Sequence, residues 1–300
     1  MKYVLTLIGN PADGGLSPAV ADKVGAAMGQ AGAMTEPMDW LAPRRAVDIV
    51  FDGQSPARAL AIARDEIGDL PIDLHAQPVA GRRRQLLVSD MDSTIIAVET
   101  IDELASALGK REEVAAITEA AMAGELDYAD SLRARTKLFT GLNESELDRV
   151  YAERVALNTG ARELVATMNK FGAVTALVSG GFSYFAERVA TDLGFQFQHA
   201  NQLEIVDGTL TGFVEEPIIT GPTKREIIER TANEHGIELP ATMGIGDGAN
   251  DIDLLDSAGI GIAYRAKPIL AECADVCINH TDLRTALYLQ GFRDSDITDD

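Results

Sequence analysis

Two aspartates, one residue apart, stand directly after a short apolar run. Asp90 and Asp92 follow residues 86–88, which read Leu-Leu-Val, and Ser-Thr comes next. Two carboxylates on a loop that leaves a strand can point into one crevice, where one acts as a nucleophile and the other moves a proton. An Asp-x-Asp pair is also common in turns and metal-binding loops, so its interpretation depends on the other segments of the chain.

Two further segments have the residue types that bind an anion. Ser179 and Gly180 follow the apolar run 173–178, and glycine at this point lets backbone N–H groups approach an anion closely. Lys224 follows Gly-Pro-Thr at the start of a predicted helix, where its ammonium could neutralise a phosphoryl group and a nearby carboxylate. Each also has an ordinary structural explanation, namely a glycine turn between strand and helix, and a solvated lysine.

A fourth segment, Gly-Asp-Gly-Ala-Asn-Asp, follows the apolar run 242–245. Its oxygen-bearing side chains belong to Asp247, Asn250 and Asp251. Hard oxygen ligands of this kind suit Mg²⁺, which also binds substrate phosphate. The alternative is a loop in which Gly, Asn and Asp serve only to make the turn. What is specific is the combination of all four segments, each placed after a strand or at a helix start.

The elements that must position these residues form two groups. From residue 86 onward, continuous apolar runs alternate with helical patterns, which is typical of a doubly wound α/β fold with a parallel sheet. Ligands bind at the carboxyl ends of the strands in such sheets, where all four segments fall. Residues 110–157 are expected to be helical. The strands are predicted at 86–88, 173–178, 242–245 and 259–263, and helices at 101–108, 160–170, 183–193 and 223–234.

The first 80 residues predict a small α+β unit with the β-α-β-β-α-β order of the ferredoxin-like motif. Its strands are expected at 3–8, 38–41, 46–51 and 72–76, and its helices at 17–30 and 56–67. Residues 77–85 are interpreted as the linker. The basic run Arg82–Arg84 within it is interpreted as solvated.

Composition excludes several classes of function. Lys and Arg number 26 against 47 Asp and Glu, a net charge of −21 that disfavours binding to nucleic acid or to an anionic membrane surface. No run approaches the roughly 20 apolar residues of a membrane span, and the first ten residues lack the features of a signal peptide. Cys273 and Cys277 are interpreted as reduced thiols. We therefore expect a cytoplasmic protein.

The four segments, in this order, resemble the signature motifs of the haloacid dehalogenase superfamily of phosphatases. Within it, the chain is similar to the phosphoserine phosphatases over about residues 86–290. The segments that carry this resemblance are DMDST (90–94), ETIDE (99–103), SLRAR (131–135), SGGF (179–182) and GDGAND (246–251). The first 80 residues loosely resemble the regulatory-type N-terminal domain of many bacterial members. The resemblance thus implies a small domain at 1–80 and a phosphatase domain at 81–300, with an inserted helical cap at about 106–157.

The resemblance assigns catalytic and metal-binding roles. It implies that Asp90 is the nucleophile that takes the phosphoryl group, and that Asp92 is the general acid that then activates water. The ligands of Mg²⁺ would be Asp90, the backbone carbonyl of Asp92, and Asp247. Asp251 would support the metal site without binding the ion directly.

It also assigns the contacts to substrate. Ser179, the backbone of Gly180, and Lys224 would hold the phosphate, and Asn250 would touch substrate or phosphate. Glu99 would pair with the amino group of phosphoserine and Arg135 with its carboxylate. From spacing alone, these two residues could equally be surface helix charges.

Two cap residues would close over the ligand and exclude water. These are Met122 and Tyr128. Tyrosine stands here where an apolar aromatic such as phenylalanine is common in the family, and its hydroxyl needs a partner if it is buried.

The implied activity is Mg²⁺-dependent hydrolysis of O-phospho-L-serine to L-serine and phosphate through an aspartyl-phosphate, the last step of serine biosynthesis. One alternative is a phosphotransferase or phosphatase for a related small amino-alcohol phosphate. Another is an amino-acid sensor with a vestigial core. The expected partner is a small molecule, with no nucleic acid or membrane, and a homodimer is left open.

Overall fold

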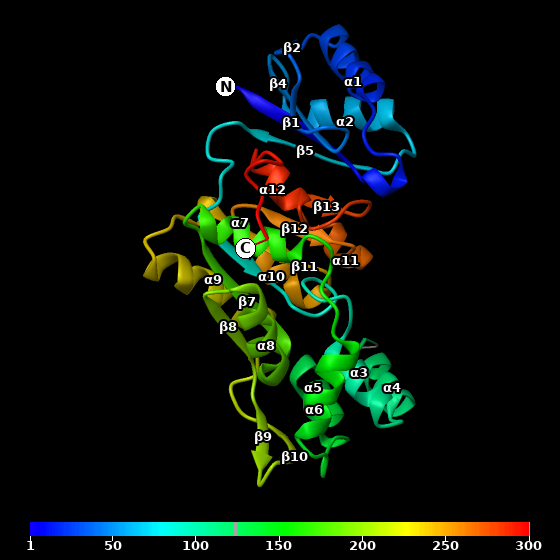
Figure 1. Cartoon of the computed structure of the whole chain (residues 1–300), viewed down its shortest axis with the longest axis vertical. Coiled ribbons are helices and arrows are strands. Elements are labelled where there is room, and N and C mark those ends of the chain that lie inside the picture. Colours follow the sequence, from blue (N-terminus) through cyan, green and yellow to red (C-terminus); the bar gives the residue numbers. More distant parts are fainter. Residues whose placement is uncertain (123–124, 300) are drawn as a thin grey trace.

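The computed structural model describes residues 1–122 and 125–299 of the chain. An antiparallel sheet with two helices lies at one end, a larger sheet lies in the middle, and a group of helices with a β-hairpin lies at the other end (Figure 1). The chain passes from the small sheet into the large one and returns at its C-terminal segment to lie between them.

The N-terminal sheet is antiparallel in the order β2-β4-β1-β5, with β3 also paired to β4. Ser17 and Ser55 cap the two helices by accepting from the N–H groups of Val20 and Arg58, and a proline follows each cap. The ferredoxin-like order is confirmed, and among the strands only the two-residue β2 was unpredicted. The elements are β1 (Tyr3–Gly9), α1 (Pro18–Gln30), β2 (Met34–Thr35), β3 (Asp39–Ala42), β4 (Ala46–Asp52), α2 (Pro56–Ile67) and β5 (Ile72–Pro78).

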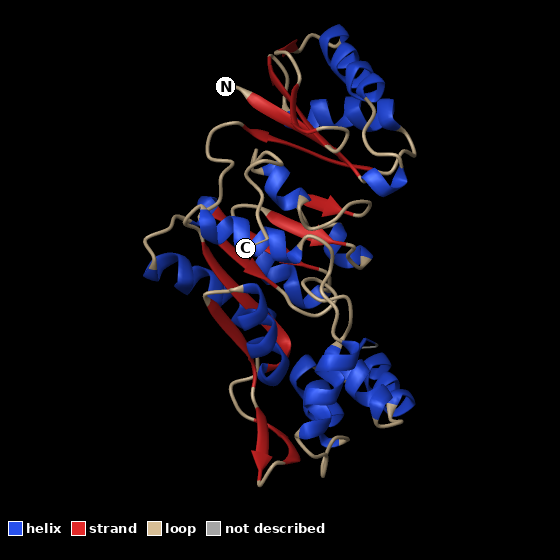
Figure 2. Cartoon of the chain, in the orientation of Figure 1, coloured by secondary structure: helices blue, strands red, loops and turns tan. Residues whose placement is uncertain are grey.

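The large sheet has six parallel strands in the order β13-β12-β11-β6-β7-β8. Successive residues of β6 enter opposite apolar clusters: Leu87 packs with α7, α8 and α12, whereas Leu86 and Val88 pack with α9, α10 and α11. Helices therefore flank both faces, as Figure 2 shows, and the predicted doubly wound parallel sheet is confirmed. The strands are β6 (Leu86–Ser89), β7 (Val174–Phe182), β8 (Phe197–Asn201), β11 (Thr242–Gly246), β12 (Gly261–Tyr264) and β13 (Val276–Ile278). The helices are α7 (Ala161–Lys170), α8 (Ser183–Leu193), α9 (Gly221–Glu234), α10 (Ile252–Ser257), α11 (Pro268–Ala271) and α12 (Thr285–Leu289).

Four helices inserted after β6 pack on one another at the end far from the N-terminal sheet (Figure 1). Their two connections to the core meet at an antiparallel bridge between Ile96 and Leu157. Asn158 fastens this junction by donating to the carbonyls of Thr94 (2.8 Å) and Ile96 (3.1 Å). A hairpin lies beside the inserted helices and packs on α5. These elements are α3 (Thr100–Ala107), α4 (Arg111–Met122), α5 (Tyr128–Lys137), α6 (Ser145–Arg154), β9 (Leu203–Val206) and β10 (Thr209–Val214).

The structure departs from the sequence-based elements at the edges of the core. β7 runs through Ser179 and Gly180 to Phe182, not to residue 178 as predicted. The edge strands β8 and β13 and the hairpin β9–β10 were not predicted. β8 reads Phe-Gln-His-Ala-Asn with mostly half-exposed residues, so it lacks the continuous apolar run that marks a central strand.

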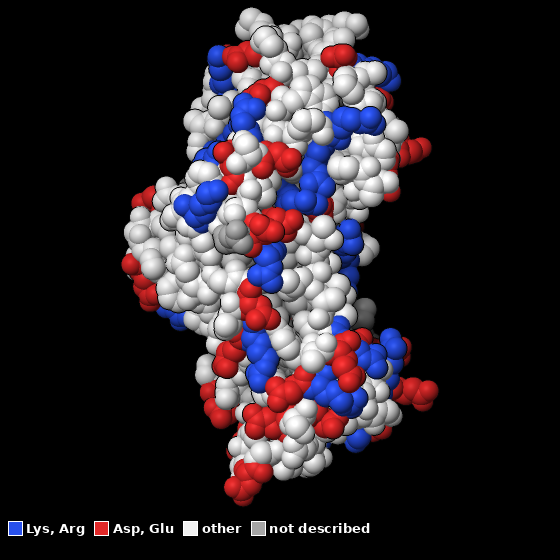
Figure 3. Space-filling model, in the orientation of Figure 1, with Lys and Arg blue, Asp and Glu red and all other residues white. Residues whose placement is uncertain are grey.

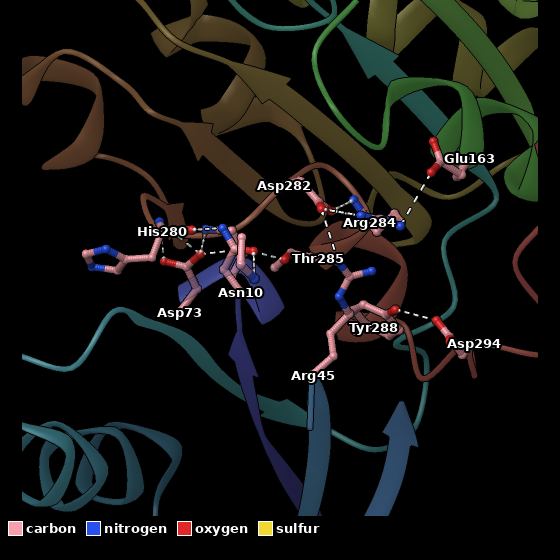
Figure 4. Close-up of polar contacts among 12 residues, drawn as sticks. Asn10, Arg45, Asp73, Glu163, His280, Asp282, Arg284, Thr285, Tyr288 and Asp294 are labelled. Atoms are coloured by element: carbon pink, nitrogen blue, oxygen red, sulfur yellow. Dashed lines mark hydrogen bonds and ion pairs between the residues drawn. The ribbon is translucent and has the colours of Figure 1, made fainter. Parts of the chain in front are cut away.

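The N-terminal sheet is joined to the core by half-buried polar contacts (Figure 4). Arg45 lies 3.5 Å from Asp282, which also pairs with Arg284 at 2.6 Å. Arg284 reaches on to Glu163 of α7 at 3.6 Å. One apolar cluster also crosses this interface, because Ile8 belongs to the same cluster as the residues of α12. The two parts are therefore packed together rather than tethered.

The interpretation of Arg82–Arg84 as a solvated run is wrong for Arg82 and Arg84, whereas Arg83 is exposed. Arg82 pairs with the buried Asp48 at 2.6 Å, and Arg84 donates to the side chain of Gln77 at 3.1 Å. The guanidinium of Arg83 lies 3.4 Å from the centre of the Phe292 ring. Residues 77 and 78 belong to β5 and are not linker. The connection between the two sheets is thus held in place by its own arginines.

The surface is charged but mixed. On the face drawn in Figure 3, Lys and Arg side chains are interspersed with Asp and Glu and do not form one basic field. Within the described residues, no helix combines the length and apolar character required to cross a bilayer.

Candidate active site

The site lies where three neighbouring strands end. β6, β7 and β11 are adjacent in the sheet, and the polar segments predicted from the sequence follow or finish these strands. The N–H of Asp90 donates to the carbonyl of Ile245 at 2.9 Å, which ties the first loop to β11. Asp90, Ser179 and Asp247 are all buried. The parallel register therefore brings together residues that are far apart in sequence.

Lys224 is the cation at the centre of the site. Its ammonium lies 2.6 Å from Asp90 and 2.6 Å from Asp251, and all three side chains are almost fully buried. Burial by itself lowers the pKa of Lys224, but the two carboxylates outweigh it and raise the pKa above its ordinary value. The lysine thus stays charged. Burial and Asp251 raise the pKa of Asp90, so a further cation beside Asp90 would favour its charged form.

Asp92 is held by hydrogen bonds to both of its carboxylate oxygens. The N–H of Thr100, at the start of α3, donates to Oδ1 at 2.7 Å, and the Ser179 hydroxyl donates to Oδ2 at 3.0 Å. Ser179 Oγ in turn accepts from the N–H of Gly181 at 2.8 Å. Burial and the charge of Glu99 raise the pKa of Asp92 to about 6, against the effect of these hydrogen bonds. Such a carboxyl can give up and take back a proton near neutral pH.

Three carboxylates form a group that can hold a cation. Asp90, Asp247 and Asp251 each offer an oxygen, and these atoms lie within 4.8 Å of one another. Burial and the charge of Asp251 raise the pKa of Asp247 to about 7, so a bound cation would relieve the repulsion among them. Asp251 is already engaged, because Oδ1 binds Lys224 and Oδ2 accepts the N–H groups of Asp247 and Gly248, each at 3.2 Å. This all-oxygen donor set fits a hard divalent ion.

Glycine is required at position 246, at the end of β11, because the side chain of Asp251 packs against it. A Cβ on Gly246 would lie 2.4 Å from the Asp251 carboxyl group. Asn250 lies next to Asp251 in the same turn, where it is half-buried. The Gly-Asp-Gly-Ala-Asn-Asp segment is thus more than a generic turn, because its glycine makes room for the carboxylate that binds Lys224.

The inserted helices bring two more predicted residues to the site. The charge of Glu99 acts on both Asp92 and Asp247, and its side chain, which is exposed, accepts from the Ser93 hydroxyl at 2.6 Å. Arg135 is half-buried on α5, where its Nε donates to the Ser131 carbonyl at 3.3 Å. Neither Glu99 nor Arg135 has an ion-pair partner among residues 1–122 and 125–299.

The remaining two predicted residues belong to the ends of α4 and α5. Tyr128 begins α5, and its hydroxyl donates to the carbonyl of Gly180 at 3.0 Å. The charges of Lys224 and Arg135 both act on this hydroxyl, so it lies over the site. Met122 is the last residue of α4, and its side chain lies outside the described part of the structure.

Sequence reasoning missed three residues of the site. Thr100 could have been found, because the first N–H groups of a helix are a ready site for a carboxylate. Ser93, which adopts a left-handed φ of 55°, orients Glu99. Asn201 donates to the Gly180 carbonyl at 2.8 Å from the edge strand β8, and no local pattern marks it.

Comparison with known proteins gives a consistent result. Residues 87–256 match the family described as haloacid dehalogenase-like hydrolase. The chain is 39% identical over 294 residues to the phosphoserine phosphatase SerB2 of Mycobacterium tuberculosis, covering 96% of this chain and 71% of that protein.

Two solved structures are similar. A haloacid dehalogenase family hydrolase from Salmonella enterica serovar Typhi matches with a TM-score of 0.84 at 25% identity, covering 96% of this chain and 98% of that one. A phospho-aspartyl intermediate analogue of phosphoserine phosphatase matches with a TM-score of 0.64 at 41% identity, covering 69% and 98% of the two chains. The chain therefore belongs to the haloacid dehalogenase-like hydrolases and, within them, to the phosphoserine phosphatase family, and it is a phosphatase.

Proposed function

We propose that this phosphatase hydrolyses O-phospho-L-serine to L-serine and phosphate, with Mg²⁺, through a phosphoryl group carried on Asp90. One observation carries the proposal. A buried carboxylate, Asp90, is held at 2.6 Å by Lys224, next to a second carboxyl, Asp92, whose two oxygens are fixed by Thr100 and Ser179. This pairing provides a nucleophile and an oriented acid within one water-excluded site.

The first half of the reaction transfers the phosphoryl group to the enzyme. A carboxylate oxygen of Asp90 bonds to phosphorus while the bond from phosphorus to the serine oxygen breaks. Asp92 gives its proton to the departing oxygen, so serine leaves as the neutral alcohol. Lys224 offsets the negative charge that otherwise keeps a phosphate dianion from Asp90.

The second half returns the enzyme to its starting state. Asp92, now a carboxylate, takes a proton from water, and the resulting oxygen bonds to phosphorus. The bond between phosphorus and Asp90 breaks, and inorganic phosphate leaves. A pKa of about 6, raised by burial and by Glu99, suits a group that must both donate and accept a proton.

Mg²⁺ would be held by Asp90, the backbone carbonyl of Asp92, and Asp247, with Asp251 supporting them. The ion supplies charge neutralisation for the phosphate and its attacking carboxylate. Asp251 suits the supporting role because both of its oxygens already bind Lys224 and backbone N–H groups. Phosphate itself would contact Ser179, the N–H of Gly180, Lys224 and Asn250.

We assign substrate choice to two side chains of opposite charge. Glu99 would bind the ammonium of phosphoserine and Arg135 its carboxylate, the latter as a two-point guanidinium contact. The two side chains are available because neither is in an ion pair within the described ranges. Met122 and Tyr128 would cover the ligand.

We assign residues 1–80 to a small regulatory-type domain and residues 81–300 to the phosphatase domain. The cap at about 106–157 includes α4 to α6 and is hinged near the bridge between Ile96 and Leu157. The enzyme would act in the cytoplasm on a small molecule, as the last step of serine biosynthesis, without nucleic acid. A homodimer is the assembly to look for by light scattering.

The test is phosphate release from L-phosphoserine, with and without Mg²⁺, beside a panel of small phosphomonoesters. Mg²⁺-dependent preference for phosphoserine supports the proposal, and Asp90→Asn should abolish turnover in a folded protein. Added homoserine separates hydrolysis from transfer to an alcohol. Turnover of other esters but not of phosphoserine would contradict the substrate and leave the role of Asp90 intact.

A further inference from the structure

Tyr128 joins the cap to the core at the phosphate-binding end of β7. Its position is fixed because it is the first residue of α5, whose start is capped by Asp127 accepting from the N–H of Asp130 at 2.8 Å. From there the hydroxyl reaches the carbonyl of Gly180 at 3.0 Å. This hydrogen bond connects a helix of the cap directly to the strand end that carries Ser179.

The acceptor of this bond is built into the core. The Gly180 carbonyl also accepts from Asn201 Nδ2 at 2.8 Å, and Asn201 Oδ1 accepts from the N–H of Ile219 at 2.7 Å. Only glycine permits the approach, because a Cβ at position 180 would lie 2.0 Å from the Tyr128 hydroxyl oxygen. The donor is equally well defined: burial raises the pKa of Tyr128 to about 12, so the hydroxyl keeps its proton at neutral pH.

Residues 141–144 of the cap bond through their backbone to the β9–β10 hairpin, whereas the side-chain ion pairs from the cap to α8 and to the segment after β10 lie at the surface. Arg133, also on α5, pairs with Glu216 at 2.6 Å, and both side chains are about half exposed. Arg188 of α8 pairs with Asp148 of α6 at 3.0 Å in a similar environment. Exposed ion pairs of this kind contribute little to holding two bodies together. The bond from Tyr128 is different because it is partly buried and lies beside the reacting carboxylates.

We propose that the Tyr128 hydroxyl is a latch that holds the cap closed on the Gly180 carbonyl and so sets how often the site opens. The inference rests on the proposed function for the meaning of the site beneath the cap, but the latch itself involves protein groups only. The Gly180 carbonyl already accepts from Tyr128 and Asn201, a phosphate group has only acceptors to offer, and the ammonium of phosphoserine is assigned to Glu99, so substrate leaves this bond in place. The latch is therefore available to the free and the bound enzyme alike, and it affects opening more than affinity.

Tyr128→Phe removes the hydroxyl and keeps the ring. The measurement is hydrogen–deuterium exchange of the peptide that covers residues 178–183 in the ligand-free protein, because the buried N–H of Gly181 donates to Ser179 Oγ inside the site. Exchange should become about two- to tenfold faster, the range that one hydrogen bond contributes to an equilibrium. Arg133→Gln, on the same helix, is the matched control and should change exchange by less than about twofold.

The kinetic readout separates a latch from a contact to substrate. With phosphoserine and Mg²⁺, Tyr128→Phe should change kcat, which depends on cap opening, more than KM, because the ring that covers the ligand is kept and the bond exists in both states. Unchanged exchange in Tyr128→Phe would overturn the proposal, as would equal acceleration in Arg133→Gln. A large rise in KM with unchanged exchange would instead place the hydroxyl on the substrate. Because exchange needs no substrate, the two exchange outcomes hold even if phosphoserine proves to be the wrong ester.

Discussion

The carboxylate of Asp73, on the last strand of the N-terminal sheet, is bound by Thr281 of the core through both its N–H (2.9 Å) and its hydroxyl (2.6 Å). The N–H groups of Asn279 and His280 also donate to Asp73, at 3.0 Å and 3.2 Å. The Asp73 carboxylate thus accepts hydrogen bonds from three consecutive residues of the loop that follows β13 (Figure 4). The next residue but one in that loop, Leu283, donates its N–H to Thr159 at 3.1 Å, beside the cap connection.

We expect Asp73→Asn to loosen this interface. An amide presents its NH₂ group to donors that now face a carboxylate oxygen, so at least one buried donor loses its partner. The free energy of unfolding should fall by about 1–3 kcal/mol. Urea unfolding of the full chain measures it, with the exposed Asp69→Asn as the control. Equal stability of the two variants would mean that the loop does not depend on Asp73.

The contrast between Asp90 and Asp73 shows how far sequence reasoning reaches. Asp90 could be found because a buried strand precedes it and the strand order of an α/β sheet places such loops together. Asp73 could not, because its partners lie more than 200 positions away and consist mainly of backbone N–H groups, which carry no side-chain signal. Asn201 was not predicted for a related reason. Its strand, β8, forms by pairing with β7 and has no apolar run that would mark it in the sequence.

Lys224→Met should destabilise the fold as well as stop catalysis. The variant leaves Asp90 and Asp251 buried without their shared cation, and breaking a buried pair costs about 3–5 kcal/mol. Adding Asp251→Asn removes one of the two unpaired charges. The double variant should therefore be more stable than Lys224→Met alone, as measured by thermal unfolding in the absence of added Mg²⁺. If the effects of the two substitutions on stability are additive, Lys224, Asp90 and Asp251 do not act as one unit.

His75 makes stability depend on pH. Burial lowers its pKa to about 4, with Arg84 acting in the same direction and Asp275 opposing it. Between about pH 6.5, the ordinary pKa of histidine, and pH 4, His75 is protonated in the unfolded chain but stays neutral in the folded protein. Stability should thus be lost as pH falls from about 6.5 to 4, by about 1–3 kcal/mol from this group.

His75→Gln should flatten that part of the stability curve. Urea unfolding at pH 7 and pH 4.5 measures the difference, with the exposed His235→Gln as the control. If His75→Gln lost as much stability between pH 7 and pH 4.5 as the wild type does, other groups would cause the acid sensitivity.

Arg135→Ala should separate recognition of the amino acid from chemistry on the phosphate. If Arg135 binds the carboxylate of phosphoserine, its loss removes a charge-assisted contact, and kcat/KM for phosphoserine should fall by about 10- to 100-fold. An aryl phosphate offers no carboxylate to this side chain, so its kcat/KM should stay within about twofold. Arg135→Lys keeps the charge but not the two-point geometry, and its loss should be intermediate. Equal losses on both esters would mean that Arg135 supports the cap or the phosphate, because only a contact made to the amino-acid part can discriminate between the two substrates.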